Sequence, residues 1–502
     1  MTSVIRRFAA RPDLISLLAA VLMFLVGAQI ALVFKVPSWG NDEPAHVGYV
    51  AALAEGRLPT IETPIVDDPA RFPGTAEEFR GWDVERGDVW TANHPPLFHL
   101  VLVPVWWALS DVNQSGMIIT MRLVNTLGFA TWLYLVGALA RQLVPRRPAV
   151  AALAVVVAAT PTLVLRSAFF QNDGWASASA ALLLLMTVRI LREGVTPRRV
   201  AVATAAGTVA AGIRAQGALM VALCAIALLV VLARRNGWTV PGWRRALGVF
   251  ALVGGVPAAA WGWFFVRNYR LYGDFSGQEA LLEKFSRIPV TSWDRIDNVP
   301  GLTQPTLATP IVIAAALLLV PIALIGSVRR HGVRLDASWA LLAVHALLTA
   351  GSVVTFIQAG GGFHDRYLMQ VMPLLATSVA VGMLGVGRWF AVPKRGTEAA
   401  DRRDWWLASA WAALLLVWLA GTIAWLQHYY VYSRQESSPV DGPVPDLLAV
   451  VAALAGVAIV AVMVSRARAL RVAGPDPRPA HGHQLEPVEA RRPSGRELAA
   501  RR

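Results

Sequence analysis

Asp42 and Glu43 stand side by side in the segment "PSWGNDEPAH", residues 37–46, just beyond the first long apolar run of the chain. A pair of carboxylates at the edge of an apolar segment could act as a general base or bind a cation. A plainer interpretation is that Asp42 caps a helix that begins near Pro44 and ends at Gly56. Capping does not require the second carboxylate, so the sequence leaves both interpretations of Asp42 open.

A histidine followed by two prolines forms the next candidate, in "TANHPPLFHL" at residues 91–100. The prolines force His94 out of the helical region and fix how the chain enters the apolar segment behind it. On its own, His94 could simply be a polar residue at a helix start. It becomes a candidate for substrate binding because of the charged residues that follow it.

Asp173 in "FFQNDGW" and Arg214 in "AAGIRAQGA" each stand between two apolar segments. Asp173 could cap the helix that follows it. Arg214 lies at the tip of a tight hairpin and could extend to lipid headgroups. Because an arginine near hydrocarbon is costly, it usually has a partner or an anionic ligand, which makes Arg214 a candidate for phosphate binding.

Two later segments combine cations with aromatic residues, "FFVRNYRLYGDFSGQ" and "GGGFHDRYLMQVMP". Either could be an interfacial belt, since Tyr and Arg favour that depth. The predicted topology, however, brings the acids, the His-Pro-Pro segment and the arginines to one face of the membrane. The candidate substrate-binding residues are His94, Asp173, Arg214, Arg267, Tyr269, Arg270, Arg366 and Tyr367.

The composition indicates an all-α polytopic membrane protein, with 56% apolar residues, 16% charged residues and a mean hydropathy of +0.50. About twelve spans are expected, with both ends of the chain in the cytoplasm. The predicted spans are 14–34, 117–138, 149–168, 174–191, 200–213, 216–233, 246–266, 308–328, 338–358, 367–387, 406–427 and 445–465.

The topology depends on "LFHLVLVPVWWAL", residues 97–109, which is too short to cross a bilayer comfortably and is predicted to be interfacial or re-entrant. With this assignment the predicted cytoplasmic loops carry 18 Lys or Arg residues and the opposite loops carry 8. That imbalance follows the positive-inside rule and places the candidate site on the extracytoplasmic side of the cell membrane. It also accounts for the net charge of +14 without a nucleic-acid partner.

Residues 1–465 are expected to form one transmembrane catalytic domain, in which 35–116 is a large extracytoplasmic loop with juxtamembrane helices. Residues 466–502 are rich in proline and charge and are predicted to be a disordered cytoplasmic tail. The single cysteine, Cys224, excludes an intramolecular disulfide and a cysteine metal cluster. No metal ligands are assigned, although a divalent cation near Asp42 and Glu43 is kept as an alternative.

In order and spacing, these motifs resemble the GT-C superfamily of glycosyltransferases that use polyprenyl-phosphate sugars, which includes protein O-mannosyltransferases and lipid A aminoarabinose transferases. The matching positions are the acidic pair after the first span, the His-Pro-Pro segment before a membrane-hugging helix, the later outer aspartate, and the three basic sites. Relatives often carry lysine at the positions of His94 and Arg214. Because histidine is mostly neutral at pH 7, His94 is the less certain phosphate ligand.

The resemblance implies transfer of a sugar from a polyprenyl-phosphate donor in the bilayer to an extracytoplasmic protein, glycan or lipid, with inversion. It implies Asp42 as the base and Glu43 as a residue that positions the acceptor or binds a cation, although the two roles could be exchanged. The cations and His94 would hold the leaving phosphate. A transporter or flippase of lipid-linked glycans is the alternative, and a non-catalytic assembly protein is a third possibility.

Overall fold

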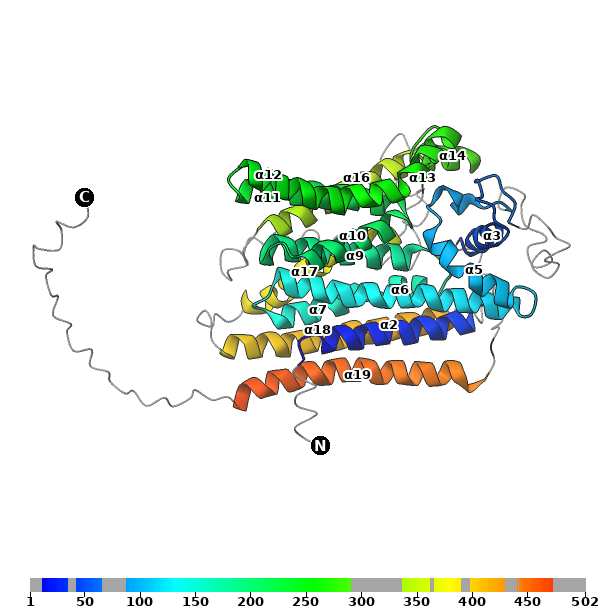
Figure 1. Cartoon of the computed structure of the whole chain (residues 1–502). Helices are drawn as coiled ribbons and strands as arrows, with labels where there is room; N and C mark the ends of the chain where they lie inside the picture. The colour runs from blue at the N-terminus through cyan, green and yellow to red at the C-terminus, as the bar shows by residue number, and fades with distance from the viewer. Residues whose placement is uncertain are drawn as a thin grey trace, which may run out of the picture.

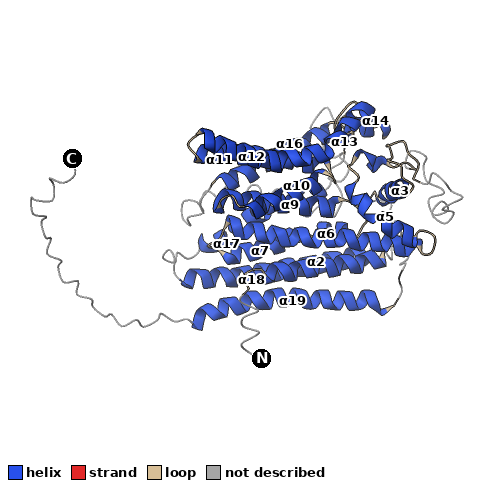
Figure 2. Cartoon of the chain, viewed as in Figure 1, coloured by secondary structure: helices blue, strands red, loops and turns tan. Residues whose placement is uncertain are grey.

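The computed structural model describes residues 11–34, 42–65, 87–289, 336–361, 365–389, 398–428, 440 and 442–472. Within these ranges the chain is helical, and the β-structure is confined to an isolated bridge between Pro64 and Asp88. Most of the long helices run side by side in a bundle (Figures 1 and 2). The prediction of an all-α polytopic membrane protein is confirmed.

Eight helices among the described residues are long and apolar enough to cross a membrane. They are α2 (Leu14–Val33), α6 (Gln114–Leu143), α9 (Asp173–Glu193), α11 (Ala215–Arg235), the continuous helix Val240–Tyr272, α16 (Ala337–Gln358), α18 (Glu398–Gln427) and α19 (Pro443–Val472). The continuous helix contains α12 (Val240–Phe250), a π-helical turn (Ala251–Gly255) and α13 (Val256–Tyr272).

Three of the predicted spans differ in detail from simple long helices. The predicted span 149–168 is a pair, α7 (Pro148–Ala158) and α8 (Pro161–Ser167), bent by 63°. The predicted spans 200–213 and 367–387 correspond to the shorter helices α10 (Pro197–Ala211) and α17 (Met372–Trp389). The predicted span 308–328 lies outside the described residues, so the total of twelve stays a prediction.

The core of the bundle is built from α2, α6, α7 and α9, whose apolar side chains form one large buried cluster. The apolar window of α9 is 83% buried, whereas that of α19 is only 17% buried. Apolar residues that remain exposed on α19, such as Leu447, Leu454 and Val457, therefore form a surface suited to lipid. The predicted end of this span at 465 falls inside α19, which continues to Val472.

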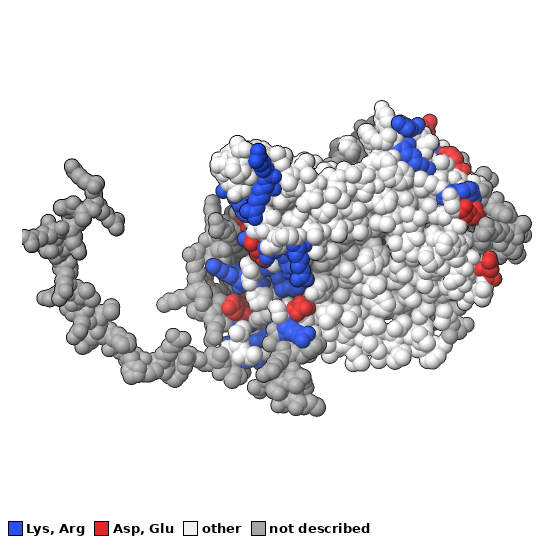
Figure 3. Space-filling model, in the orientation of Figure 1, with Lys and Arg blue, Asp and Glu red and all other residues white. Residues whose placement is uncertain are grey.

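One end of the bundle carries the short elements α3 (Glu43–Ala54), η3 (Trp90–Asn93), α5 (Leu97–Leu109) and α14 (Gln278–Lys284) (Figure 1). We call it the site end. The helix predicted between Pro44 and Gly56 is confirmed as α3, and α5 has only 13 residues and lies beside it. In Figure 3 the opposite end is rich in Lys and Arg, and a broad uncharged band separates the two ends. Such a band is what a membrane-embedded surface requires.

Candidate active site

Asp42 occupies the N-cap position of α3, but its side chain does not cap the helix. Its backbone is left-handed, with φ of 60°, a conformation that non-glycine residues seldom adopt and that often marks functional positions. Its carboxylate accepts hydrogen bonds from Trp90 Nε1 at 3.3 Å and from Arg366 at 2.7 Å. The side chain is 34% exposed, so this carboxylate can be reached from outside the protein.

Glu43 points in the opposite sense and is completely buried. Both carboxylate oxygens accept hydrogen bonds at 2.7 Å from Arg122, and Oε1 also accepts one from the backbone N–H of Phe170 at 2.8 Å. Arg122 additionally donates to the carbonyls of Ala31 and Phe34 at 2.9 and 3.0 Å. The expected role of Glu43 in acceptor or cation binding therefore gives way to a structural one, in which it joins the end of α2, the start of α3, and α6.

The loop between α8 and α9 presents Asp173 to the same site. Asn125 of α6 fixes this loop, since its side chain donates to Phe169 O at 2.7 Å and accepts from Gly174 N at 3.3 Å. Asn172 holds the N-cap position of α9, and Asp173 is the first helical residue. Asp173 pairs with Arg214 and lies 3.5 Å from Arg366, so ion pairing replaces the capping role considered from the sequence.

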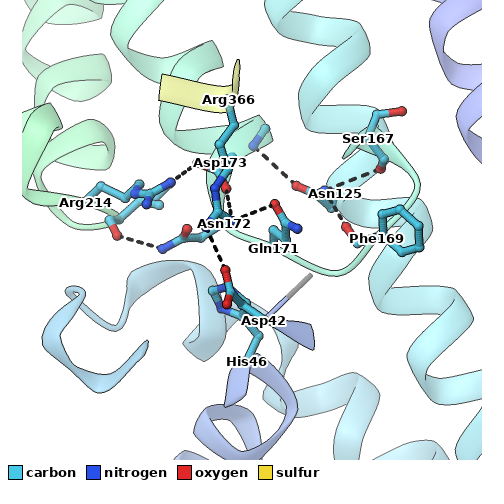
Figure 4. Close-up of polar contacts among 12 residues, drawn as sticks. Asp42, His46, Asn125, Ser167, Phe169, Gln171, Asn172, Asp173, Arg214 and Arg366 are labelled. Carbon is cyan, nitrogen blue, oxygen red and sulfur yellow. Dashed lines mark hydrogen bonds and ion pairs between the residues drawn. The ribbon is translucent and has the colours of Figure 1, made fainter. Parts of the chain in front are cut away.

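Arg214 and Arg366 converge on the two aspartates from different parts of the chain (Figure 4). Arg366 also donates to Gln171 at 3.2 Å. Among the described residues no hydrogen-bond partner accepts from the buried Nε atoms of Arg214 and Arg366. Two guanidinium groups that retain unused donors beside an accessible carboxylate suit an anionic ligand, because charge-assisted hydrogen bonds to phosphate are strong.

The two arginines of this cluster remain charged at neutral pH. Burial, followed by the nearby Arg366, lowers the pKa of Arg214 to about 10, which still leaves the guanidinium protonated. Burial also opposes the charge of Arg366, but Asp42 and Tyr367 outweigh it and raise the pKa of Arg366. The cluster of Asp42, Asp173, Arg214 and Arg366 is therefore an arrangement of two acids and two permanent cations.

Histidines surround Asp42 without adding charge. Burial, with Arg214 next in importance, lowers the pKa of His94 well below its ordinary value, which favours the neutral imidazole. His46, one turn after Asp42, contacts His99 through Nδ1 and Nε2 at 2.9 Å, and burial lowers the pKa of His46 to about 3. Tyr49 stacks on His99 at 4.1 Å and donates to His94 O at 2.8 Å.

The remaining candidates have other contacts. Arg267 donates to Pro59 O at 2.6 Å and lies over the Phe264 ring. Tyr269 is 54% exposed and stacks on Phe275, and Arg270 is also exposed. These residues belong to the outer end of α13, away from the contacts of Asp42. Tyr367 packs edge-on against Phe356 and lies beside Arg366.

Sequence reasoning missed Arg122, Asn125 and the His46–His99 pair. The signal for Arg122 was present, because a charged residue within a predicted span ("MIITMRLVN") usually marks a buried partner or a function. A divalent cation shared by Asp42 and Glu43 does not fit this geometry, since Arg122 and Phe170 engage the oxygens of Glu43. The described residues also hold no group of three His, Cys, Asp or Glu with metal-binding geometry.

Part of the chain matches a known family of membrane proteins. A family described as "Predicted membrane protein (DUF2142)" matches residues 82–289, a range that contains His94, Asp173 and Arg214 but neither Asp42 nor Arg366. No curated protein matches.

Among solved structures, the chain is similar to ArnT from Cupriavidus metallidurans bound to undecaprenyl phosphate. The TM-score is 0.45 and the identity 14%, over 94% of this chain and 79% of that one. The apo state of ArnT gives a TM-score of 0.38, with 14% identity over 89% and 76% of the two chains.

The archaeal oligosaccharyltransferase AglB from Archaeoglobus fulgidus, in complex with an inhibitory peptide and a dolichol-phosphate, gives a TM-score of 0.44. Its identity is 12%, over 89% of this chain and 55% of AglB. Likeness at this level carries no residue role from one protein to another, so the chemistry must come from the side chains of this chain.

Proposed function

We propose that this protein is a membrane glycosyltransferase that transfers a sugar from a polyprenyl-phosphate-linked donor to an extracytoplasmic acceptor, with inversion at the anomeric carbon. The observation that carries the proposal is the strained, accessible Asp42 beside Arg366 and the Asp173–Arg214 pair. This cluster lies at the end of an apolar bundle, where a lipid tail can remain in the bilayer while its phosphate reaches Arg214 and Arg366 (Figure 1).

In the proposed reaction Asp42 accepts the proton of an acceptor hydroxyl. The hydroxyl oxygen forms a bond to the anomeric carbon while the bond from that carbon to the phosphate oxygen breaks. The electron pair stays with the polyprenyl phosphate, and Arg214 and Arg366 stabilise its charge as it leaves. One displacement of this kind inverts the anomeric centre.

Arg366 also controls how strong a base Asp42 is. It is bound to Asp42 at 2.7 Å, and an ion-paired carboxylate is a weaker base than a free one. A phosphate arriving between Arg214 and Arg366 competes for the same guanidinium. Donor binding would then release Asp42 and make it a better base only when the donor is present. Asp173 keeps Arg214 and Arg366 near each other throughout.

The buried Glu43–Arg122 pair acts as a positioning element in this scheme. It fixes the residue next to Asp42 from one side and the backbone of the 169–173 loop from the other. The geometry favours an enzyme over a transporter of lipid-linked glycans, because the cluster of charged groups lies at helix ends and in loops. Transporters more often place their substrate sites near the midplane of the membrane.

The experiment that tests the proposal uses the full-length protein in lipid nanodiscs. Undecaprenyl phosphate should bind in native mass spectra. Three donors are then tested, with mannose, glucose or arabinose on undecaprenyl phosphate. At least one of them should lose its sugar when membrane extract is added. If neither undecaprenyl phosphate nor any of these donors binds, the protein is not a transferase of this kind.

A further inference from the structure

Two buried asparagines connect η3 to the outer end of α13. Asn268 Nδ2 donates to Asn93 O at 2.8 Å, and Asn93 Nδ2 donates to Ser276 O at 3.0 Å. These two bonds fix the orientation of both amides, because the reverse orientation would place a carbonyl oxygen against another carbonyl oxygen. Asn93 is 6% exposed and Asn268 is fully buried.

The oxygens of both amides lack a donor. Asn93 Oδ1 and Asn268 Oδ1 are buried without a hydrogen-bond partner in the described part of the chain, and the same is true of one terminal nitrogen of Arg267. An unpaired buried polar atom is costly, so three from neighbouring residues indicate a ligand that is not yet bound. The protein offers two acceptors, the amide oxygens, and one donor, the Arg267 nitrogen. Hydroxyl groups of a ligand can bond to both kinds, since a hydroxyl both donates and accepts.

The position of Asn93 relates this polar cluster to Asp42. Residues three apart in a 3₁₀-helix lie on the same face, so Asn93 follows Trp90 at about 6 Å along the axis. The carboxylate of Asp42 contacts Trp90, on the side of Asn93, through Oδ1, and it contacts Arg366 through Oδ2. In a single displacement the acceptor enters opposite the leaving phosphate, and an acceptor on the Asn93 side agrees with this requirement.

A short strap, residues 273–286, covers the asparagines. Gly277, at φ +66°, packs so closely that an added Cβ would lie 3.0 Å from Asn93 Cβ. The helix of the strap, α14, has no buried residue. Lys284, which is 11% exposed, ties it to Glu62 at 2.6 Å and to Asp88 at 2.7 Å, and the partly buried Ala280, Leu281 and Phe285 pack against the cluster that contains Trp90. A ligand reaches the amide oxygens only when the strap lifts off these contacts by local opening.

From these contacts we propose that Asn93, Asn268 and Arg267 form an acceptor subsite for a carbohydrate, closed by the strap. The assignment deepens the proposed transferase function and rests on it. Two amide oxygens need two separate donors in addition to the hydroxyl that reacts at Asp42. A serine or threonine side chain offers one hydroxyl, whereas a sugar ring offers several. Trp90, in the same 3₁₀-helix as Asn93, and Tyr272, which packs on Gly277, are aromatic residues that border this cluster.

The test uses Asn268→Leu and Asn93→Leu, which keep similar size but remove both hydrogen-bonding groups. Methyl mannoside, methyl glucoside, methyl arabinoside and a Ser/Thr peptide serve as probes in saturation-transfer NMR of the nanodisc-embedded protein with undecaprenyl phosphate. The parent should bind at least one glycoside, and each variant should bind it about tenfold more weakly. Undecaprenyl phosphate should bind all three proteins equally, which separates this subsite from the phosphate site.

Lys284→Met serves as the matched control for the strap. It should accelerate hydrogen exchange over 278–284 while glycoside binding persists. If Asn268→Leu does not fold, Asn93→Leu still decides, because its side chain bonds only a loop carbonyl. The proposal is overturned if the parent binds none of the glycosides or if Asn93→Leu binds them as tightly as the parent. An asparagine-dependent affinity for the peptide alone would assign the subsite to a protein acceptor instead.

Discussion

Asp42 accepts a hydrogen bond from Arg366 at 2.7 Å across 324 positions of sequence. This contact joins the start of α3 to the segment before α17, and the ion pairs of Asp173 with Arg214 and Arg366 add the start of α9 and the turn between α10 and α11. Four separate parts of the chain thus assemble one charged cluster at the site end.

The two arginines should carry the affinity for lipid phosphate. Arg366→Gln and Arg214→Gln should each weaken undecaprenyl phosphate binding by about 10- to 100-fold, because a hydrogen bond to a charged group contributes about 1.5–3 kcal/mol. Arg270→Gln is the matched control, since Arg270 is exposed at the same end of the bundle. Native mass spectrometry with titrated lipid measures all three. Equal affinities for parent, Arg214→Gln and Arg366→Gln would move the phosphate site elsewhere.

The Glu43–Arg122 pair should contribute to stability. Removing one partner leaves an uncompensated buried charge, so Arg122→Met should lower the free energy of unfolding by about 3–5 kcal/mol. The double variant Glu43→Leu with Arg122→Met should recover much of this loss, because it buries no charge. Thermal unfolding in detergent measures the effect. A single variant as stable as the parent would show that the pair is dispensable.

Acid should destabilise the protein partly through His46. Its pKa is about 3 in the fold, lowered mainly by burial, and about 6.5 when unfolded. Between these values the unfolded chain binds more protons, so stability falls as the pH drops from about 6.5 towards 3. His46→Gln should reduce the difference in melting temperature between pH 7 and pH 4.5. Asp42, Arg214, Arg366 and His99 surround this group, so a pH response identical to the parent would show that His46 does not dominate it.

The topology makes a separate prediction. If the 18-to-8 distribution of Lys and Arg sets orientation, the loop 234–245 faces the cytoplasm and the site end faces outwards. Single cysteines on a Cys224→Ser background, one at Trp238 and one at Glu62, should differ in labelling by an impermeant maleimide applied to intact cells. Only the cysteine at position 62 should react. Labelling at position 238 would reverse the assigned orientation.

Much of this architecture could be predicted from the sequence, because apolar runs and arginine clusters report directly on helices and loops. The short α5, the α10–α11 hairpin around Arg214 and the helix after Asp42 follow from local patterns. What the sequence could not show is the direction of adjacent side chains. Asp42 and Glu43 look equivalent in sequence, and only the left-handed backbone at Asp42 turns one outward and the other towards Arg122.

Contacts between residues far apart in the sequence could not be predicted either. No pattern in a single sequence pairs Glu43 with a residue 79 positions away, or Asn93 with one 175 positions away. The charge of His94 was also beyond reach, since its pKa depends mainly on burial and then on Arg214. The fold class is therefore a property of local composition, whereas the site depends on tertiary packing.

The central claim is that Asp42 takes a proton, and Asp42→Asn tests it most directly. Asn preserves the size but has one acceptor oxygen, so it keeps the hydrogen bond to Trp90 or to Arg366 and not both. Because this side chain caps no helix and is 34% exposed, the melting temperature should fall only modestly. Sugar transfer from an undecaprenyl-phosphate donor should fall by about 10²- to 10⁴-fold, the usual contribution of general base catalysis. Glu55→Gln, at the other end of α3, should retain parental activity. Near-parental transfer by Asp42→Asn would contradict the account, because an amide cannot act as the base.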